Sequence, residues 1–228
     1  MKIGVLVTGT VAAEMPLHSF VVKRDWKRSG DSIRKNIIDC WDTEIETYLS
    51  VDCIEEPHTI RSLIEYYNPQ AIAVQSTYTN PSHVKTKDTR RMVHKYVAGL
   101  SLMLHRELDF IITTRPDISL VQPLSSLNVD FNKFNFVFRE HSYWNEDNTR
   151  KLDTAPLVCD NLFAFPGKHL ATFVDSVNEL QIKEPKFDMH NIYSYVRHRI
   201  GDEAINFMVD EQYTSTGNEI YTLDRHFE

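Results

Sequence analysis

The sequence has few cysteines, few glycines and no long apolar run. Its three cysteines, Cys40, Cys53 and Cys159, form no CxxC pair, which argues against a cysteine zinc site and suits reduced thiols. With only seven glycines, the chain contains neither a Walker nor a Rossmann glycine motif, so P-loop and dinucleotide chemistry are excluded. No apolar run approaches the roughly 20 residues that a membrane-spanning helix needs.

An excess of positive charge is also missing. The formal charge of the 228-residue chain is −7, which argues against a general affinity for nucleic acid. The densest basic cluster, KTKDTRRMVHK from Lys85 to Lys95, is better explained as a solvated helix face. The N-terminus does not resemble a signal peptide, so we expect a cytoplasmic protein without a membrane span, in the host cytoplasm if the protein is viral.

Strand-like and helix-like segments alternate through the first half of the sequence. The predicted strands are Ile3–Val7, Glu44–Asp52, Ala71–Ser76 and Phe110–Thr114. The predicted helices are one that begins at Asp31 or Ser32, one at Thr59–Asn68 and one at Thr89–Arg106. This alternation predicts parallel strands that are joined by crossover helices.

The second half has a mixed pattern. It contains an alternating strand at Lys133–Glu140, a strand within Leu157–Pro166, a helix at Gly167–Leu180, a shorter helix at 189–201 and a tail of strand and turn. No linker or repeat divides the chain. We therefore predict one α/β domain over residues 1–228, with a mixed, mainly parallel central sheet and helices on both faces.

Polar residues follow two of the predicted parallel strands. Thr8-Gly9-Thr10 comes after the first strand and Arg115-Pro116-Asp117 after the fourth. In open α/β sheets, ligands bind at the carboxyl ends of the strands. Asp117 can hold a divalent cation while Arg115 binds phosphate oxygens, or both residues can form salt bridges at the rim of the sheet. Spacing alone does not separate these two readings.

The run LDFIITTRPDISL resembles the YDxVIxxRPDL segment of GT-A-type glycosyltransferases, in particular the glycosyltransferase-like proteins of large algal DNA viruses and their bacterial relatives in lipopolysaccharide synthesis. The resemblance spans nearly the whole chain. Five further segments fall in the order expected for this family: KIGVLVTGT, SIRKNIIDCW, RSLIEYYNPQAIAV, KFNFVFREHSYW and VCDNLFAFPGKHLATF. The resemblance implies a GT-A-like, Rossmann-like fold with a nucleotide-sugar-binding half at 1–124 and an acceptor-side half at 125–228.

The resemblance also implies a reaction, the transfer of a sugar from a nucleotide sugar, with a UDP-sugar as the expected donor, to a glycan or glycoprotein acceptor. In GT-A enzymes an Asp-x-Asp element holds a divalent metal on the diphosphate, and Asp117 occupies that position. We expect a Mn or Mg ion, with His190 as a second ligand. Arg115 stands where the first acid belongs, so the alternative is that Arg115 supplies part of the charge and metal dependence is weak.

The resemblance assigns further residues to the two substrates. Asp160 is expected to be catalytic, as general base or acceptor-positioning carboxylate, together with Asp117. The expected nucleotide-sugar-binding residues are Thr8, Gly9, Thr10, Arg34, Arg115 and Asp117, with Ser32 beside Arg34. The expected acceptor-binding residues are Glu140, His141, Tyr143 and Trp144. Each of these residues also has a simpler explanation. Asp160 can cap a turn, the aromatic residues can pack together as the core of a lid, and Ser32 and Arg34 can lie on a solvated helix face.

Two other functions use the same residues. A nucleotide-sugar hydrolase would direct the same acids at water. A non-catalytic carbohydrate-binding or protein-binding domain would keep the fold without the chemistry, which the absence of the first aspartate allows.

Overall fold

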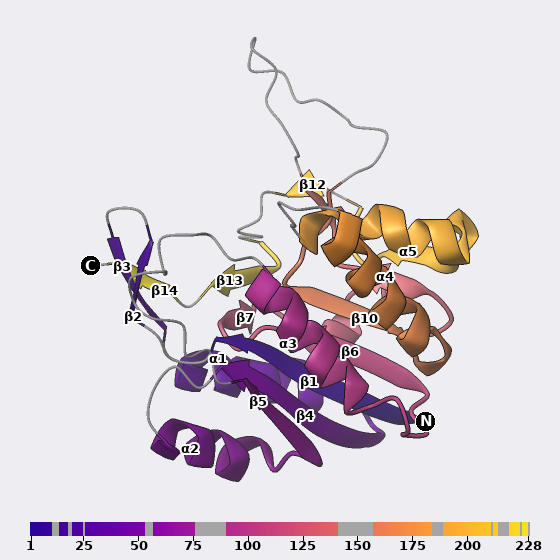
Figure 1. Ribbon diagram of the computed structural model, residues 1–228. Coiled ribbons are helices and arrows are strands. Elements are labelled where there is room, and N and C mark those ends of the chain that lie inside the picture. Colours follow the sequence, from indigo (N-terminus) through magenta and orange to yellow (C-terminus); the bar gives the residue numbers. More distant parts are fainter. Residues whose placement is uncertain are drawn as a thin grey trace.

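A sheet of seven strands forms the centre of the molecule (Figure 1). The computed structural model describes residues 1–10, 14–17, 20–24, 26–52, 57–75, 90–140, 157–183, 189–210, 212–213, 219–223 and 225–227. The strands of the sheet are β1 (Lys2–Thr10), β4 (Glu44–Asp52), β5 (Ala71–Gln75), β6 (Phe110–Thr114), β8 (Phe134–Phe136), β10 (Leu162–Pro166) and β11 (Ile205–Phe207). Their order is β11-β8-β10-β6-β1-β4-β5, and only β10 runs antiparallel to its neighbours. The predicted mixed, mainly parallel sheet is confirmed.

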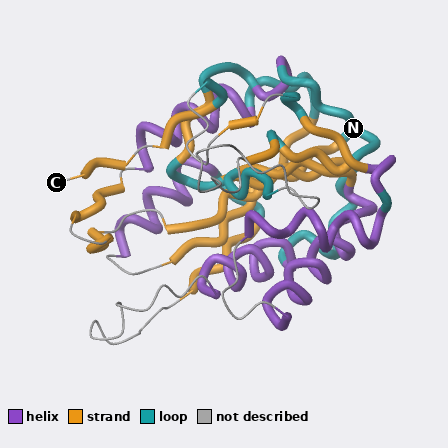
Figure 2. Tube along the Cα trace, turned by 90° about the horizontal axis from the view of Figure 1, so that it is seen from above, coloured by secondary structure: helices purple, strands orange, loops and turns teal. Residues whose placement is uncertain are grey.

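Helices cover both faces of this sheet, as Figures 1 and 2 show. On one face lie α1 (Trp26–Ile33), its π-helical continuation η1 (Arg34–Ile38) and α2 (Pro57–Tyr67); on the other lie α3 (Arg90–Ser101), α4 (Leu170–Lys183) and α5 (Ile192–Ile200). Side chains of β1 alternate between two buried clusters, so that Val5 packs with the first group of helices and Leu6 with the second. Burial on both faces explains the continuous apolar runs of β1 and β6.

Short strands extend the structure beyond the central sheet. β7 (Ile118–Leu120) pairs with β13 (Tyr221–Leu223), β9 (Arg139–Glu140) with β12 (Gln212–Tyr213), and β3 (Phe20–Arg24) with both β2 (Glu14–Leu17) and β14 (Arg225–Phe227). Single 3-10 turns are η3 (Leu124–Ser126), η4 (Gly167–His169), η5 (Met189–Asn191) and η6 (Asp202–Ala204). The last two strands, β13 and β14, therefore return to pair with segments from the first half of the chain.

Four of the predicted elements are wrong in their extent. The first strand continues to Thr10, so Thr8-Gly9-Thr10 is part of β1, and the helix expected to reach Arg106 ends at Ser101. The helix expected from Asp31 begins at Trp26, because Trp26 is buried and packs against the rings of Tyr66 and Tyr67. The single strand expected at Lys133–Glu140 is two strands, β8 and β9, in different sheets. Between them Val137 and Phe138 are both buried, which breaks the alternation that a half-exposed strand requires.

The order of the strands places a topological switch point beside β1. The chain runs from β1 outward through β4 to β5, and then returns to β6 on the other side of β1. A crevice forms where successive connections leave a sheet in opposite directions, and ligands of open α/β sheets bind there, at the carboxyl ends of the strands. The ends of β1 and β6 are therefore the place to look for a site.

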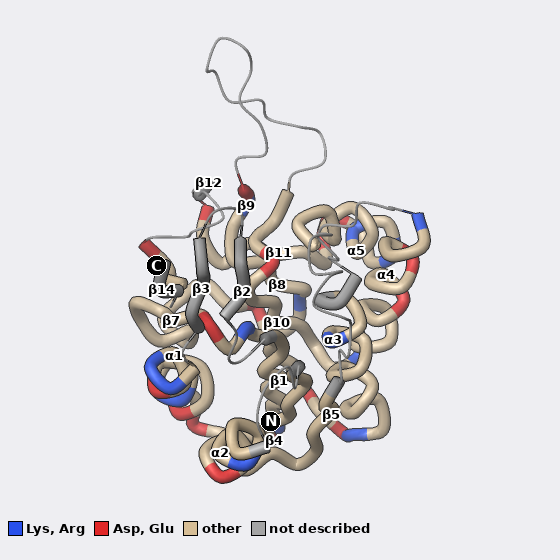
Figure 3. Tube along the Cα trace, turned by 60° about the vertical axis from the view of Figure 1, so that its left-hand side comes forward, with Lys and Arg blue, Asp and Glu red and all other residues tan. Residues whose placement is uncertain are grey.

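The outer surface carries charges of both signs. Figure 3 shows cationic and acidic segments side by side on α1, α2, α4 and α5. None of the helices in the described ranges is long and apolar enough to cross a bilayer.

A substitution at Gly167 tests how tightly the backbone before α4 is packed. A Cβ at this position would lie 1.8 Å from the carbonyl oxygen of Leu108. We expect Gly167→Ala to lower the free energy of unfolding by about 3 kcal/mol, because the backbone must move to relieve the overlap. Urea unfolding measures the loss.

Gly30→Ala is the matched control. Its Cβ would lie 3.3 Å from the ring of Tyr66, and the helix propensity of alanine in α1 offsets the tighter contact, so the change should stay within about 1 kcal/mol. Equal losses for the two variants would contradict the packing described here.

Candidate active site

A buried ion pair lies directly beyond the end of β6. The Arg115 guanidinium donates from Nε to Asp117 Oδ1 and from Nη2 to Asp117 Oδ2, both at 2.9 Å, in a bidentate fork. The side chains are only 11% and 3% exposed. Burial by itself lowers the pKa of Arg115, but the carboxylates of Asp117 and Asp160 outweigh it and hold that pKa above its ordinary value. Arg115 is therefore a permanent cation at the switch point.

Three neighbouring segments fix the turn that carries this pair. Ser29 of α1 donates a hydrogen bond to the carbonyl of Pro116, and the amide of Arg115 donates to the carbonyl of Asn161 at 3.2 Å. Gly9 of β1 has a φ of +149°, and a Cβ there would lie 2.8 Å from Pro116 Cδ. The glycine that the sequence suggested for close approach of a nucleotide is thus needed for close approach of this proline.

Glu140, Asp160 and His190 meet beside the ion pair, although they lie far apart in the sequence. His190 Nδ1 lies 2.8 Å from Glu140 Oε2 and 3.0 Å from the carbonyl oxygen of Val158, while His190 Nε2 lies 3.6 Å from Asp160 Oδ2. Both carboxylates are buried, and the amide of Val158 donates back to the carbonyl of His190 at 3.0 Å. The ring is therefore held from the side chain and from the backbone.

These contacts determine the proton position on His190. A backbone carbonyl only accepts hydrogen bonds, so Nδ1 must carry a hydrogen, which it directs toward Val158 and Glu140. The other nitrogen, Nε2, is then the one that faces Asp160. A histidine oriented by one carboxylate and facing a second can take part in proton transfer together with that second carboxylate.

Tyr96 of α3 holds the backbone of Asp160. Its hydroxyl donates to the backbone carbonyl of Asp160 at 3.0 Å, and burial, followed by the charge of Asp160, raises the pKa of Tyr96 far above its usual range. Tyr96 therefore stays a neutral donor at any physiological pH. The name carboxyl-edge cluster is used below for Arg115, Asp117, Glu140, Asp160 and His190.

Taken by itself, the carboxyl-edge cluster is acidic. Its three carboxylates outnumber its one guanidinium, and the sum is negative whichever charge the imidazole carries. Such a cluster stabilises a developing positive charge and accepts hydrogen bonds from hydroxyl groups. It repels a bare diphosphate, which would need a cation beside it.

The metal ligands expected from the sequence do not meet in this arrangement. Both oxygens of Asp117 accept hydrogen bonds from Arg115, whereas His190 contacts Glu140 and Asp160. Within the described ranges, no group of three or more His, Cys, Asp or Glu is placed to hold a metal ion. The carboxylate of Asp117 is engaged by Arg115 in the described geometry, which favours the alternative in which Arg115 supplies part of the charge. The expected Mn or Mg ion stays a prediction.

The remaining expected residues are placed as follows. Thr8 is buried near the end of β1, and its hydroxyl has no hydrogen-bond partner in the described part of the chain. Arg34 lies over the ring of Tyr66 and donates to the Tyr66 carbonyl at 2.8 Å, so the structure does not bring it to the cluster. Ser32 donates to the carbonyl of Leu120. The side chain of Thr10 and residues His141, Tyr143 and Trp144 lie outside the described residues.

Sequence reasoning missed two residues of the site, Tyr96 and Asn161. Tyr96 lies within the helix predicted at Thr89–Arg106, and the signal that could have found it is that a buried tyrosine hydroxyl needs a partner. Asn161 follows Asp160 and donates to the hydroxyl of Tyr221 at 2.6 Å, which ties the start of β10 to β13. No local pattern indicated that contact, because it joins residues 60 positions apart.

Removing one member of the buried ion pair tests its role. We expect Asp117→Ala to lower the free energy of unfolding by about 3 kcal/mol, because it deprives a buried guanidinium of its paired carboxylate. The double variant Arg115→Met, Asp117→Leu should recover most of this loss, since no buried charge remains. Chemical denaturation measures both variants, and a single variant as stable as the unchanged protein would show that the pair is not buried as described.

Comparison with known proteins finds no family model that matches the chain and no curated protein that is similar to it.

Proposed function

We propose that the protein is a GT-A-like glycosyltransferase, which transfers a sugar from a nucleotide sugar, with a UDP-sugar as the expected donor, to a hydroxyl of a glycan acceptor. The observation that carries the proposal is the convergence of the carboxyl-edge cluster beside the switch point between β1 and β6. The mixed sheet and the sequence resemblance support the same assignment.

The chemistry of glycosyl transfer suits an acidic cluster. The bond to the leaving group breaks ahead of bond formation, so the transition state carries positive charge on the sugar ring, which nearby carboxylates stabilise. Asp160, with His190 Nε2 at 3.6 Å, would accept the proton of the acceptor hydroxyl as it attacks. Glu140 would act indirectly, by holding the imidazole in the orientation that keeps Nε2 toward Asp160.

The donor is proposed to lie between the ends of β1 and β6. Thr8 offers a buried hydroxyl without a described partner, and Arg115 offers a cation whose charge would be shared between Asp117 and the leaving diphosphate. Asp117 would then act as a positioning residue, by fixing the orientation of Arg115.

A nucleotide-sugar hydrolase is the second candidate. The contact between Asp160 and His190 favours it equally, because the same pair can accept a proton from water instead of from a sugar hydroxyl. Release of free sugar at the same rate with and without an acceptor would identify the hydrolase. A rate that depends on an added glycan would identify the transferase.

The proposal predicts separate effects on binding and turnover. Calorimetry against a panel of nucleoside diphosphates and nucleotide sugars, with and without Mn, should detect binding to the unchanged protein.

Asp160→Asn should keep the affinity for the donor but lower turnover by roughly 100-fold or more, because the proton acceptor is lost. Glu140→Gln should lower turnover by about 10-fold to 100-fold through misorientation of His190.

Asp175→Asn provides the matched control, because Asp175 is an exposed aspartate of α4 outside the cluster. It should change neither binding nor turnover. If no nucleotide or nucleotide sugar binds under either metal condition, both enzyme functions are wrong, and a non-catalytic binding domain is the remaining candidate.

A further inference from the structure

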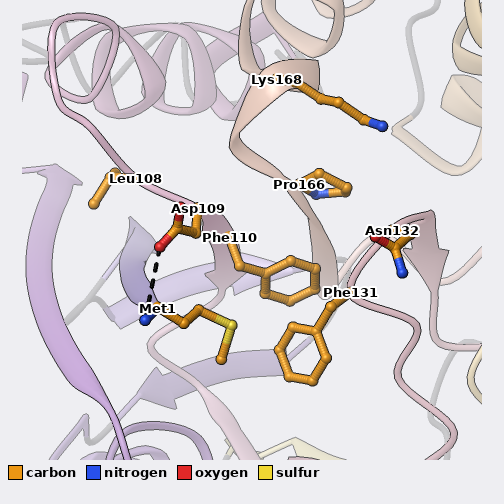
Figure 4. Close-up of a pocket in the computed structure, with 8 residues that line it drawn as sticks. All are labelled: Met1, Leu108, Asp109, Phe110, Phe131, Asn132, Pro166 and Lys168. Carbon is orange, nitrogen blue, oxygen red and sulfur yellow. Dashed lines mark ion pairs between the residues drawn. The ribbon is translucent and has the colours of Figure 1, made fainter.

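A pocket lies at the edge of the central sheet opposite the carboxyl-edge cluster. Its volume is about 390 Å³, within the range of small-molecule sites. Figure 4 shows its lining residues, which are Met1, Leu108, Asp109, Phe110, Phe131, Asn132, Pro166 and Lys168. Phe110 opens β6 and Arg115 follows its end, so about 15 Å of strand separates this pocket from the carboxyl-edge cluster. The name amino-edge pocket is used for it below.

The backbone holds the floor of the amino-edge pocket rigidly. Phe110 of β6 pairs with Pro166 of β10, and the two sides are joined by hydrogen bonds from Gly167 N to Asp109 O at 2.8 Å and from Asp109 N to Lys2 O at 2.9 Å. A preformed floor reduces the ordering cost of binding a ligand.

An exposed aromatic ring forms one wall. Phe131 is 37% exposed, and two further rings keep it in place. Phe110 packs against it with a centroid distance of 4.8 Å, and Trp41 meets it edge to face at 5.5 Å. The ring therefore presents a fixed apolar surface to a ligand at little cost in side-chain entropy.

Hydrogen-bond donors and acceptors lie beside the two rings. In Figure 4, Lys168 and Asn132 lie on one side of the two rings and Asp109 on the other. They provide ammonium and amide donors together with amide and carboxylate acceptors. Asp109 accepts a hydrogen bond from the amide of Lys2 at 2.7 Å and lies 3.9 Å from the N-terminal amine, and these contacts hold its carboxylate in place.

We propose that the amino-edge pocket binds one sugar unit of a carbohydrate chain. A pyranose has an apolar face of C–H groups that packs on an aromatic ring, and hydroxyls at its edge that both donate and accept hydrogen bonds. The pocket matches that pattern: the exposed ring of Phe131, packed against the buried ring of Phe110, provides the apolar surface, and Asp109, Asn132 and Lys168 provide the polar rim. This site is independent of the proposed enzyme activity, since it shares no residue with the carboxyl-edge cluster.

Saturation-transfer NMR tests the proposal with a panel of methyl glycosides of glucose, galactose, mannose, N-acetylglucosamine and xylose. The unchanged protein should transfer saturation to at least one of these glycosides. We expect a Kd for that glycoside in the millimolar range, which corresponds to a binding free energy of about −4 kcal/mol. Phe131→Ala should weaken that binding roughly threefold to tenfold, while Phe131→Trp should preserve or strengthen it.

Two control variants separate this site from others. Ile182→Ala removes another exposed apolar side chain, on α4, which is 83% exposed and outside the pocket. Asp160→Asn alters the carboxyl-edge cluster, so it would disrupt the proposed activity without affecting the amino-edge pocket. Both variants should bind the glycoside as the unchanged protein does.

Three results would overturn the proposal. They are the absence of saturation transfer to every glycoside, equal affinity in the Phe131→Ala variant, and loss of binding in the Asp160→Asn variant. Light scattering adds a further check, because a dimer that Phe131→Ala dissociates would place a second copy of the chain in the pocket instead of a sugar.

Discussion

The bidentate pair of Arg115 and Asp117 is the interaction on which the organisation of the site depends. A guanidinium at the end of a buried strand must be neutralised, and Asp117 does so through two hydrogen bonds of 2.9 Å. The turn that makes this geometry possible needs Gly9 beneath Pro116 and Ser29 above its carbonyl. The end of β1, the start of α1 and the end of β6 are thereby fixed together at the switch point.

The groups that we propose to transfer the proton, Asp160 and His190, come from the second half of the chain. Because β10 runs antiparallel to β6, its first residues lie beside the last residues of β6, and Asp160 is brought to the edge where Arg115 emerges. His190 arrives from η5, where it is locked by a two-way backbone and side-chain contact with Val158. Reversal of one strand is thus what lets both halves of the chain contribute to a single cluster.

Much of this organisation could be predicted from the sequence. The alternating pattern of β4 and the apolar run of β6 gave the observed bounds of both strands, and the predicted strands alternate with helices. The special position of Arg115 and Asp117 was also predictable, since two charged residues at the end of a buried strand require an explanation. Their pairing with each other was not predictable in preference to a metal or a phosphate, because spacing does not reveal side-chain direction.

The meeting of Glu140, Asp160 and His190 could not be predicted. It depends on β9, η5 and the antiparallel β10, none of which has a local pattern that fixes its place. The exposed ring of Phe131 gave no signal, because one aromatic residue in a polar turn looks the same whether it is buried or exposed.

The central claim is that a nucleotide sugar binds at the carboxyl edge of the sheet between β1 and β6. Backbone amide shifts in a two-dimensional ¹H–¹⁵N spectrum, recorded while a UDP-sugar is added, test it most directly. The claim predicts the largest shifts at Thr8, Gly9, Arg115 and Asp160. Shifts confined to the opposite edge, around Asp109 and Phe131, or no shifts at all, would contradict it.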